Sequence, residues 1–91
     1  MNIRPFSTLL RKDGFTKEYD TVAGGGRTVQ FCKTVGDRKV EVQLFDDGKH
    51  RTSHFLNGRM CTHPTPFETP EQMAYAIEIE LTRTDHPERK Y

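Results

Sequence analysis

The chain has 91 residues, a length that predicts a single domain. Only 33% of the residues are hydrophobic and the mean hydropathy is -0.80, so the core must be small and the margin of stability narrow. A net charge of +1 excludes the strong overall positive charge of many nucleic-acid-coating proteins. Two cysteines are too few for a disulfide-rich secreted scaffold, and neither a membrane-spanning apolar run nor a signal-peptide pattern is present. We therefore expect a cytoplasmic protein.

Near the N-terminus, the apolar residues Phe6, Leu9 and Leu10 are spaced three and four apart, which is typical of one face of a helix. Ser7 could cap the start of such a helix, and Asp13-Gly14 could end it. The spacing predicts a short helix here, and an irregular arm is the alternative.

The rest of residues 1–26 is less regular. Residues 15–22 carry a few apolar side chains among charges and allow either an extra strand or a loop. Gly24-Gly25-Gly26 fits neither of the common phosphate-binding glycine spacings and has no strand–glycine–helix context. It predicts a flexible hinge between the N-terminal arm and the next segment.

Residues 27–62 predict an antiparallel β-meander of about four strands. Apolar and polar residues alternate with a period of two on both sides of Gly36-Asp37, a two-residue turn type. Closing a hairpin there places these residues opposite one another: Val29 and Leu44, Phe31 and Val42, Lys33 and Val40. All of them lie on one face, so pattern and register agree.

The next two turns contain Asp47-Gly48 and Asn57-Gly58, both strong hairpin signals. With two-residue loops, the predicted pairs are Val40–Phe55, Val42–Ser53, Leu44–Arg51 and Phe55–Met60. The buried face then consists of Val29, Phe31, Val40, Val42, Leu44, Phe55 and Met60. A three-residue loop at Asp46-Asp47-Gly48 is the alternative, and it would turn His50, Thr52, His54 and Leu56 inward. We prefer the first register because it buries Phe55 and Met60 together.

Residues 69–84 predict the one long helix. Thr69 is suited to the N-cap, Pro70 to the first helical position and Gln72 to the reciprocal capping bond, with Glu71 in the first turn. The helix should run from Pro70 to about Thr84. Its apolar stripe, expected to pack on the valine and phenylalanine face of the sheet, consists of Met73, Ala74, Ala76, Ile77 and Leu81.

Tyr75 and Ile79 lie on a different side of this helix. We expect them to pair with each other or to pack under the N-terminal segment, and a partner contact is the alternative. The predicted fold class is therefore α+β: a meander with one C-terminal helix on one face and a short N-terminal helix.

No catalytic constellation is apparent, so we expect neither enzymatic activity nor a cofactor. In the preferred register Cys32, Glu41, His54 and Cys61 form one row on the other face of the sheet, and His63 follows nearby. Cysteine and histidine are zinc ligands, but neither C-x-x-C nor H-x-x-x-H spacing occurs. We expect no metal, and Cys32, His54, Cys61 and His63 are the fallback ligands.

Charge is unevenly distributed along the chain. The meander has seven basic and four acidic residues, whereas residues 70–91 have three basic and five acidic residues. A basic sheet can be an ordinary solvated surface or a face that binds nucleic acid or an acidic partner, with Phe45, His50 or His54 available for stacking. The candidate partner- or RNA-binding residues are Arg27, Lys33, Arg38, Lys39, Lys49, Arg51 and Arg59.

The segments Asn57-Gly58-Arg59-Met60 and Thr69-Pro70-Glu71-Gln72-Met73-Ala74-Tyr75-Ala76-Ile77 resemble those of small phage anti-CRISPR proteins directed at type I-F CRISPR-Cas systems. The likeness extends over most of the chain but includes no short diagnostic motif, so it carries no site residues across. It implies a non-enzymatic inhibitor that binds the multi-subunit Cas protein–crRNA surveillance complex in the host bacterial cell and blocks target DNA recognition. Direct contact with the crRNA backbone is part of that expectation. A small nucleic-acid-binding regulator that uses the basic sheet is the alternative.

Overall fold

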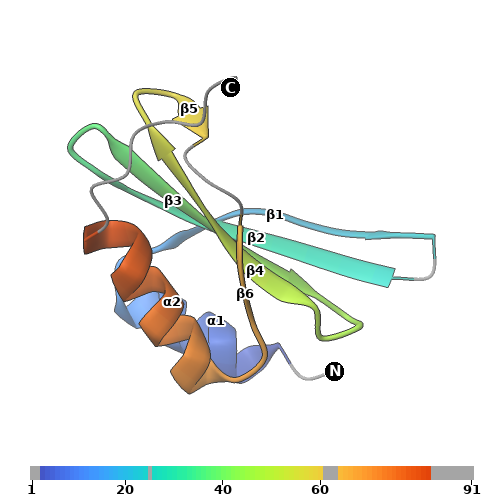
Figure 1. Cartoon of the computed structure of the whole chain (residues 1–91). Coiled ribbons are helices and arrows are strands. Elements are labelled where there is room, and N and C mark those ends of the chain that lie inside the picture. The colour runs from blue at the N-terminus through green and yellow to red at the C-terminus, as the bar shows by residue number, and fades with distance from the viewer. Residues whose placement is uncertain (1–2, 25, 61–63, 83–91) are drawn as a thin grey trace, which may run out of the picture.

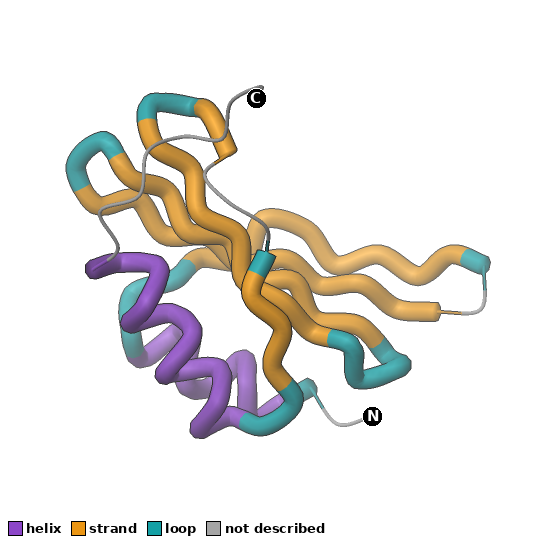
Figure 2. Tube along the Cα trace, viewed as in Figure 1, coloured by secondary structure: helices purple, strands orange, loops and turns teal. Residues whose placement is uncertain are grey.

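The computed structural model describes residues 3–24, 26–60 and 64–82, and shows an α+β fold in which an antiparallel sheet carries its helices on one face (Figures 1 and 2). The elements are α1 (Arg4–Lys12), β1 (Thr16–Ala23), β2 (Gly26–Val35), β3 (Arg38–Phe45), β4 (His50–Leu56), β5 (Arg59–Met60), β6 (Thr65–Phe67) and α2 (Pro70–Thr82). Strands β1 to β5 are neighbours in chain order, and β6 pairs with β4. The described sheet thus has six strands rather than about four.

Helix α1 forms, but it begins one turn earlier than predicted. Pro5 lies in its first turn, and Ile3 at the N-cap makes no side-chain capping bond, so Ser7 is not the cap. The predicted end is confirmed, since Asp13 is the C-cap and Gly14 follows with φ +89, a conformation that glycine adopts without strain. Phe6 is buried against the sheet.

Residues 16–23 form strand β1, not a loop, and β1 pairs with β2 along its length apart from a bulge between Lys17 and Tyr19. Ala23 pairs with Gly26, so β1 and β2 form a hairpin of one sheet, and the predicted hinge between an arm and the meander is wrong. The far end of this hairpin extends beyond both helices (Figure 1). All eight residues of β1 are exposed.

The first predicted hairpin is confirmed in register. Val29 lies opposite Leu44 and Phe31 opposite Val42, and all four side chains are buried. The turn uses Gly36 with φ +63. Together with Val40, these residues form the part of the core that β2 and β3 contribute.

The second hairpin has the alternative register, and the preferred one is wrong. The Gly48 N–H donates to the Phe45 carbonyl at 3.0 Å and Gly48 has φ +81, which is the geometry of a turn followed by a left-handed third loop residue. Val40 therefore faces His54 and Val42 faces Thr52. One-residue slippage turns every side chain of a strand over.

The core face of β4 consequently contains polar residues. His50, Thr52 and His54 are buried, whereas Phe55 is only partly buried and Met60 is 38% exposed. The predicted burial of Phe55 and Met60 is thus wrong. Their pairing is confirmed, with Asn57 (φ 55) and Gly58 (φ 82) in a tight turn between β4 and β5.

Helix α2 begins as predicted. The Gln72 N–H donates to Thr69 Oγ1 at 3.1 Å, and the Thr69 N–H donates to Gln72 Oε1 at 3.3 Å, completing the capping box. Its inner face buries Met73, Ala76 and Ile77, with Leu81 packed against the core, but Ala74 is exposed. The part of the predicted helix beyond Thr82 lies outside the described residues.

Strand β6 was not predicted, because its central Pro66 and the nearby Pro64 favour a connector. It pairs with the first half of β4 through His50–Phe67, Arg51–Pro66 and Thr52–Thr65, while β5 pairs with the second half. Phe67 is buried in the core. The β4 edge is thereby covered by two short strands.

Truncation of Ile77 should test the docking of α2. Ile77 is 5% exposed and belongs to the core, so Ile77→Ala should lower the free energy of unfolding by about 2–5 kcal/mol, measured by urea denaturation. Val35→Ala is the control, because Val35 is 47% exposed and should change stability little. Equal losses in the two variants would contradict this packing.

Candidate interaction surfaces

The seven predicted basic residues do not gather on one surface. Lys33 pairs with Val40 and Arg38 pairs with Leu56, so both lie on the face of the sheet that packs against the helices. Lys39 pairs with Phe55 and Arg51 pairs with Gln43, so both lie on the opposite face, called here the uncovered face. The others are Arg27 near the end of the β1–β2 hairpin, Lys49 in the β3–β4 loop and Arg59 in β5.

Carboxylates neutralise several of these cations. Arg27 makes two bonds to Asp20, at 2.9 and 2.7 Å, and this guanidinium is the main reason that the pKa of Asp20 falls to about 2. Lys33 lies 3.8 Å from an Asp13 carboxylate oxygen and donates to the Asp13 carbonyl at 2.8 Å. Pairing of this kind keeps local net charge low, so the count of basic residues overstates the positive potential of the sheet.

Lys39 is held in the same way on the uncovered face. Its ammonium lies 3.3 Å from Glu18 and 3.2 Å from Glu41, and hydrogen bonds to these carboxylates raise its pKa. Gln30 donates to Glu18 at 2.6 Å, and this bond is the main cause of the lowered pKa of Glu18. The positive charge of Lys39 on this face is therefore neutralised by the neighbouring carboxylates.

A row of hydrogen-bonded side chains crosses the uncovered face over four strands. The hydroxyl of Tyr19 donates to Gln30 Oε1 at 3.2 Å, and Gln43 Nε2 donates to the same oxygen at 2.7 Å. Arg51 Nε donates to Gln43 Oε1 at 2.5 Å. Each bond restricts the rotamers of the side chains that it joins, so the row forms an ordered polar surface.

Arg51 stands at the end of this row and is exposed. Its guanidinium carbon lies 5.3 Å from the centroid of the Phe45 ring, within the range of a cation–π contact. Among the described residues, Nε is the only guanidinium nitrogen of Arg51 with a hydrogen-bond acceptor. The bond to Gln43 and the contact with Phe45 thus orient the guanidinium, and its two terminal nitrogens are available to bind a phosphate or carboxylate.

The fallback metal site is not assembled. Cys32 lies opposite Glu41, but Glu41 lies opposite Ser53, and His54 is on the other face because of the register of β4. Cys61 and His63 lie outside the described residues. Within residues 3–24, 26–60 and 64–82, no three potential ligands converge on a metal position.

Instead, β4 and α2 enclose a buried polar cluster that the sequence reasoning missed. Glu80 is 0% exposed, and its Oε2 accepts hydrogen bonds from Thr52 at 3.2 Å and Thr65 at 3.0 Å. His54 Nδ1 lies 3.7 Å from the other carboxylate oxygen. Glu80 follows Ala76 and Ile77 at helical spacing, so its position on the buried stripe was a signal in the sequence.

Arg38 fixes the tautomer of His54. An arginine nitrogen can only donate, and Arg38 Nη1 lies 3.3 Å from His54 Nε2, so Nε2 must accept. The proton of the neutral imidazole is then on Nδ1, which faces Glu80. The 3.7 Å between Nδ1 and the Glu80 carboxylate is an electrostatic contact, because it is too long for a hydrogen bond.

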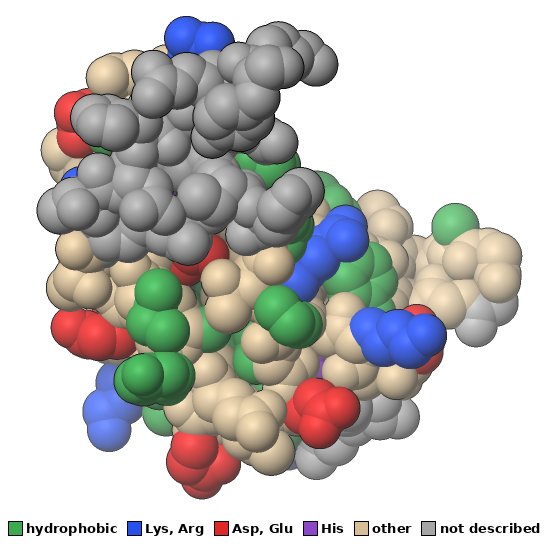
Figure 3. Space-filling view, viewed as in Figure 1, with side chains coloured by type: hydrophobic (Ala, Val, Ile, Leu, Met, Phe, Trp, Pro, Cys, Tyr) green, Lys and Arg blue, Asp and Glu red, His purple; other side chains and the backbone are tan. Residues whose placement is uncertain are grey.

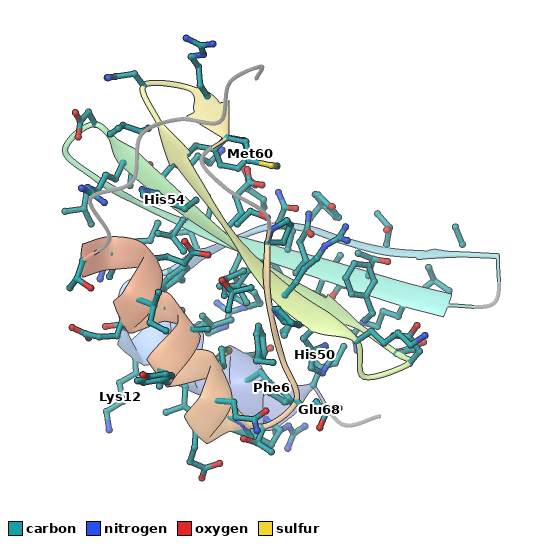
Figure 4. All side chains as sticks on the ribbon, in the orientation of Figure 1. Phe6, Lys12, His50, His54, Met60 and Glu68 are labelled. Atoms are coloured by element: carbon teal, nitrogen blue, oxygen red, sulfur yellow. The ribbon has the colours of Figure 1, made fainter. Side chains whose placement is uncertain are left out.

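His50 is a second buried histidine, and its surroundings are apolar. His50 lies beside Phe6 (Figure 4). Its ring centroid is 4.7 Å from that of Phe6 and 5.5 Å from that of Phe67. The Phe45 N–H donates to Nδ1 at 3.0 Å, whereas Nε2 is buried with no hydrogen-bond partner among the described residues. Neither His50 nor His54 is accessible for the stacking role suggested by the sequence, but Phe45 is partly exposed.

The buried position of His50 predicts acid sensitivity. Burial lowers the pKa of His50 below its ordinary value of 6.5, so the unfolded chain binds more protons than the folded chain as pH falls below 6.5. The His50 contribution should be intact above that pH and should be lost toward pH 5, with a slope of at most about 1.4 kcal/mol per pH unit.

Chemical denaturation across pH 5 to 8 measures this slope. His50→Gln retains a side-chain acceptor for the Phe45 N–H but does not titrate, so its stability should depend less on pH in this range. An unchanged slope in the variant would assign the acid sensitivity to other groups.

Removal of Glu80 should show how much the buried cluster contributes to the free energy of unfolding. Glu80→Ala leaves His54 and two threonine hydroxyls without their carboxylate, and we expect a loss of about 3–5 kcal/mol in unfolding free energy. Glu78→Ala, on the exposed side of the same helix, should change it by less than about 0.5 kcal/mol. Similar thermal denaturation curves for both variants would show that the cluster contributes nothing.

A scan against protein-family models found no match to this chain, and comparisons with curated proteins and with solved structures found none either. Among the described residues, neither helix is long and apolar enough to cross a lipid bilayer. Function must therefore be inferred from the surfaces that the fold presents.

Proposed function

We propose that this protein is a non-enzymatic inhibitor that binds the type I-F crRNA-guided surveillance complex in the cytoplasm of the host bacterium and blocks recognition of target DNA. The resemblance of residues 57–60 and 69–77 to anti-CRISPR proteins supports the identity of the target. The uncovered face of the sheet supports the mode of action, because it is a surface for binding and not a cleft for chemistry.

The observation that carries the proposal is the arrangement of Arg51. Its Nε is held by the bond to Gln43 and its guanidinium lies over the Phe45 ring, while the residue as a whole is exposed. A forked donor that is already oriented loses little conformational entropy on binding. It suits a crRNA phosphate or a carboxylate of a Cas subunit equally well.

The remaining polar row supports a stoichiometric mechanism. Tyr19, Gln30 and Gln43 are held by one another before any partner arrives. A pre-ordered surface of this kind favours a complex with slow dissociation, since binding requires no rearrangement of the sheet. An inhibitor present in amounts comparable to its target needs that property.

The alternative function is a small nucleic-acid-binding regulator. Phe45 beside Arg51 is the observation that favours it, because an aromatic ring next to a guanidinium can stack a base and hold its phosphate. Binding of an isolated single strand or duplex by the protein alone, at physiological salt, would favour the regulator. Binding only to the assembled Cas protein–crRNA complex favours the inhibitor.

Substitution of Arg51 tests the proposal. Titration into a purified type I-F complex should abolish binding of labelled target DNA near one molecule of protein per complex. Arg51→Glu should weaken this inhibition by about tenfold or more, and Arg51→Lys should have a smaller effect because it keeps the charge but loses the fork. The loss of one exposed charge should leave the melting temperature nearly unchanged.

Arg4→Glu is the matched control. Arg4 is exposed at the start of α1 on the helix side of the sheet, where an acidic residue is also compatible with the helix dipole. It should inhibit at full strength. Full inhibition by Arg51→Glu would contradict this interface, and absence of any binding to the complex would contradict the proposed target.

A further inference from the structure

The outer side of α2 presents an aromatic residue that the fold does not need. Tyr75 is 70% exposed and lies opposite the buried side of the helix that carries Met73 and Ile77. Residues 71, 75 and 78 succeed one another at helical spacing along this outer side. The face of the molecule formed by α2 and β6 shows hydrophobic patches between acidic groups (Figure 3).

A hollow of about 400 Å³ lies beside Tyr75, between α2 and β6. Its apolar walls come from Pro66, Tyr75, Ala76 and Ile79. The predicted packing of Tyr75 and Ile79 under the N-terminal segment is wrong, because α1 meets α2 on its other side, around Ala74 and Leu81. The side chains of Tyr75 and Ile79 therefore border an open surface.

Acidic groups lie at one end of this hollow and along the helix beside it. Glu68 lines the hollow, whereas Glu71 and Glu78 flank Tyr75 on α2 without lining it, and all three are exposed. In the part of the chain that the structure describes, none of the three forms an ion pair. This contrasts with the sheet, where carboxylates are engaged by lysine and arginine.

We propose that the α2–β6 surface, defined as Pro66, Glu68, Glu71, Tyr75, Glu78 and Ile79, binds a basic amphipathic α-helix of a protein partner. Leucine- or methionine-sized side chains of that helix occupy the hollow, and its lysine or arginine residues meet the three carboxylates. Apolar anchors in a groove with a charged rim are the usual form of helix-in-groove recognition.

Other occupants fit less well. A nucleic acid or an anionic membrane would be repelled by the carboxylates. A second copy packed symmetrically around Tyr75 would bring Glu71 of one copy near Glu78 of the other, which is unfavourable. An added β-strand would find no backbone donor at the middle of β6, because Pro66 has no amide hydrogen.

The test uses the full chain labelled with ¹⁵N and a synthetic amphipathic peptide of leucine and lysine. Titration should shift the amide resonances of residues 66–68 and 71–79, with affinity falling as salt is raised. A leucine–glutamate peptide of the same pattern should not bind. A leucine–lysine peptide whose leucines are distributed all round the helix should bind at least about tenfold more weakly, since it has no apolar stripe.

Matched variants locate the anchor. Tyr75→Ser should weaken binding of the amphipathic peptide by about tenfold or more, whereas Tyr19→Ser, on the uncovered face of the sheet, should not. Glu71→Lys combined with Glu78→Lys should transfer the preference to the leucine–glutamate peptide. Equal binding of the patterned and distributed lysine peptides, shifts confined to other elements, or no binding at millimolar peptide would each overturn the proposal.

The test does not involve the surveillance complex. The α2–β6 surface adjoins Arg51 at Pro66, with which Arg51 pairs, but its anchor Tyr75 is on α2, so Tyr75→Ser and Arg51→Glu change different side chains and each interface can be measured by itself. Failure of the peptide titration therefore leaves the proposed inhibition standing, and failure of inhibition leaves this surface standing.

Discussion

The three-residue loop between β3 and β4 is the constraint on which the interior depends. The left-handed conformation of Gly48 sets the register of β4, and that register turns His50, Thr52 and His54 toward the helices. A loop one residue shorter would have presented Phe55 instead. The chemistry of the core therefore follows from a backbone conformation that glycine adopts readily.

Buried polar groups on the sheet require hydrogen-bond partners from the helix that packs against them. Glu80 supplies the acceptors that Thr52 and Thr65 need, and Arg38 and His54 complete the cluster from the sheet. Hydrogen bonds are directional, so such a cluster specifies one position of α2 along the sheet where an apolar contact alone would tolerate sliding. It adds specificity to a chain whose apolar content is low.

Local signals carried most of the correct predictions. The Gly36 hairpin and the Thr69 capping box were predictable because turn residue, periodicity and partner positions agree within a few residues. The sequence Asp46-Asp47-Gly48 permits two loop lengths, and only burial against Glu80, far along the chain, distinguishes them. The candidate site was less predictable, because the number of basic residues does not say on which face of the sheet each one lies. Lys33 and Arg51, for example, point to opposite faces.

The β1–β2 hairpin has a consequence for the dynamics of the chain. Every residue of β1 is exposed, and β1 pairs with a single strand, while β3 lies between two neighbours with its inward side chains buried. Separation of β1 from β2 exposes almost no core, so its amides should exchange with deuterium through local opening at a much lower free energy than those of β3. The amides at the centre of the sheet should therefore exchange slowly and those at its β1 border rapidly. The uncovered face includes both regions, so a partner bound to that face is expected to slow exchange chiefly along β1.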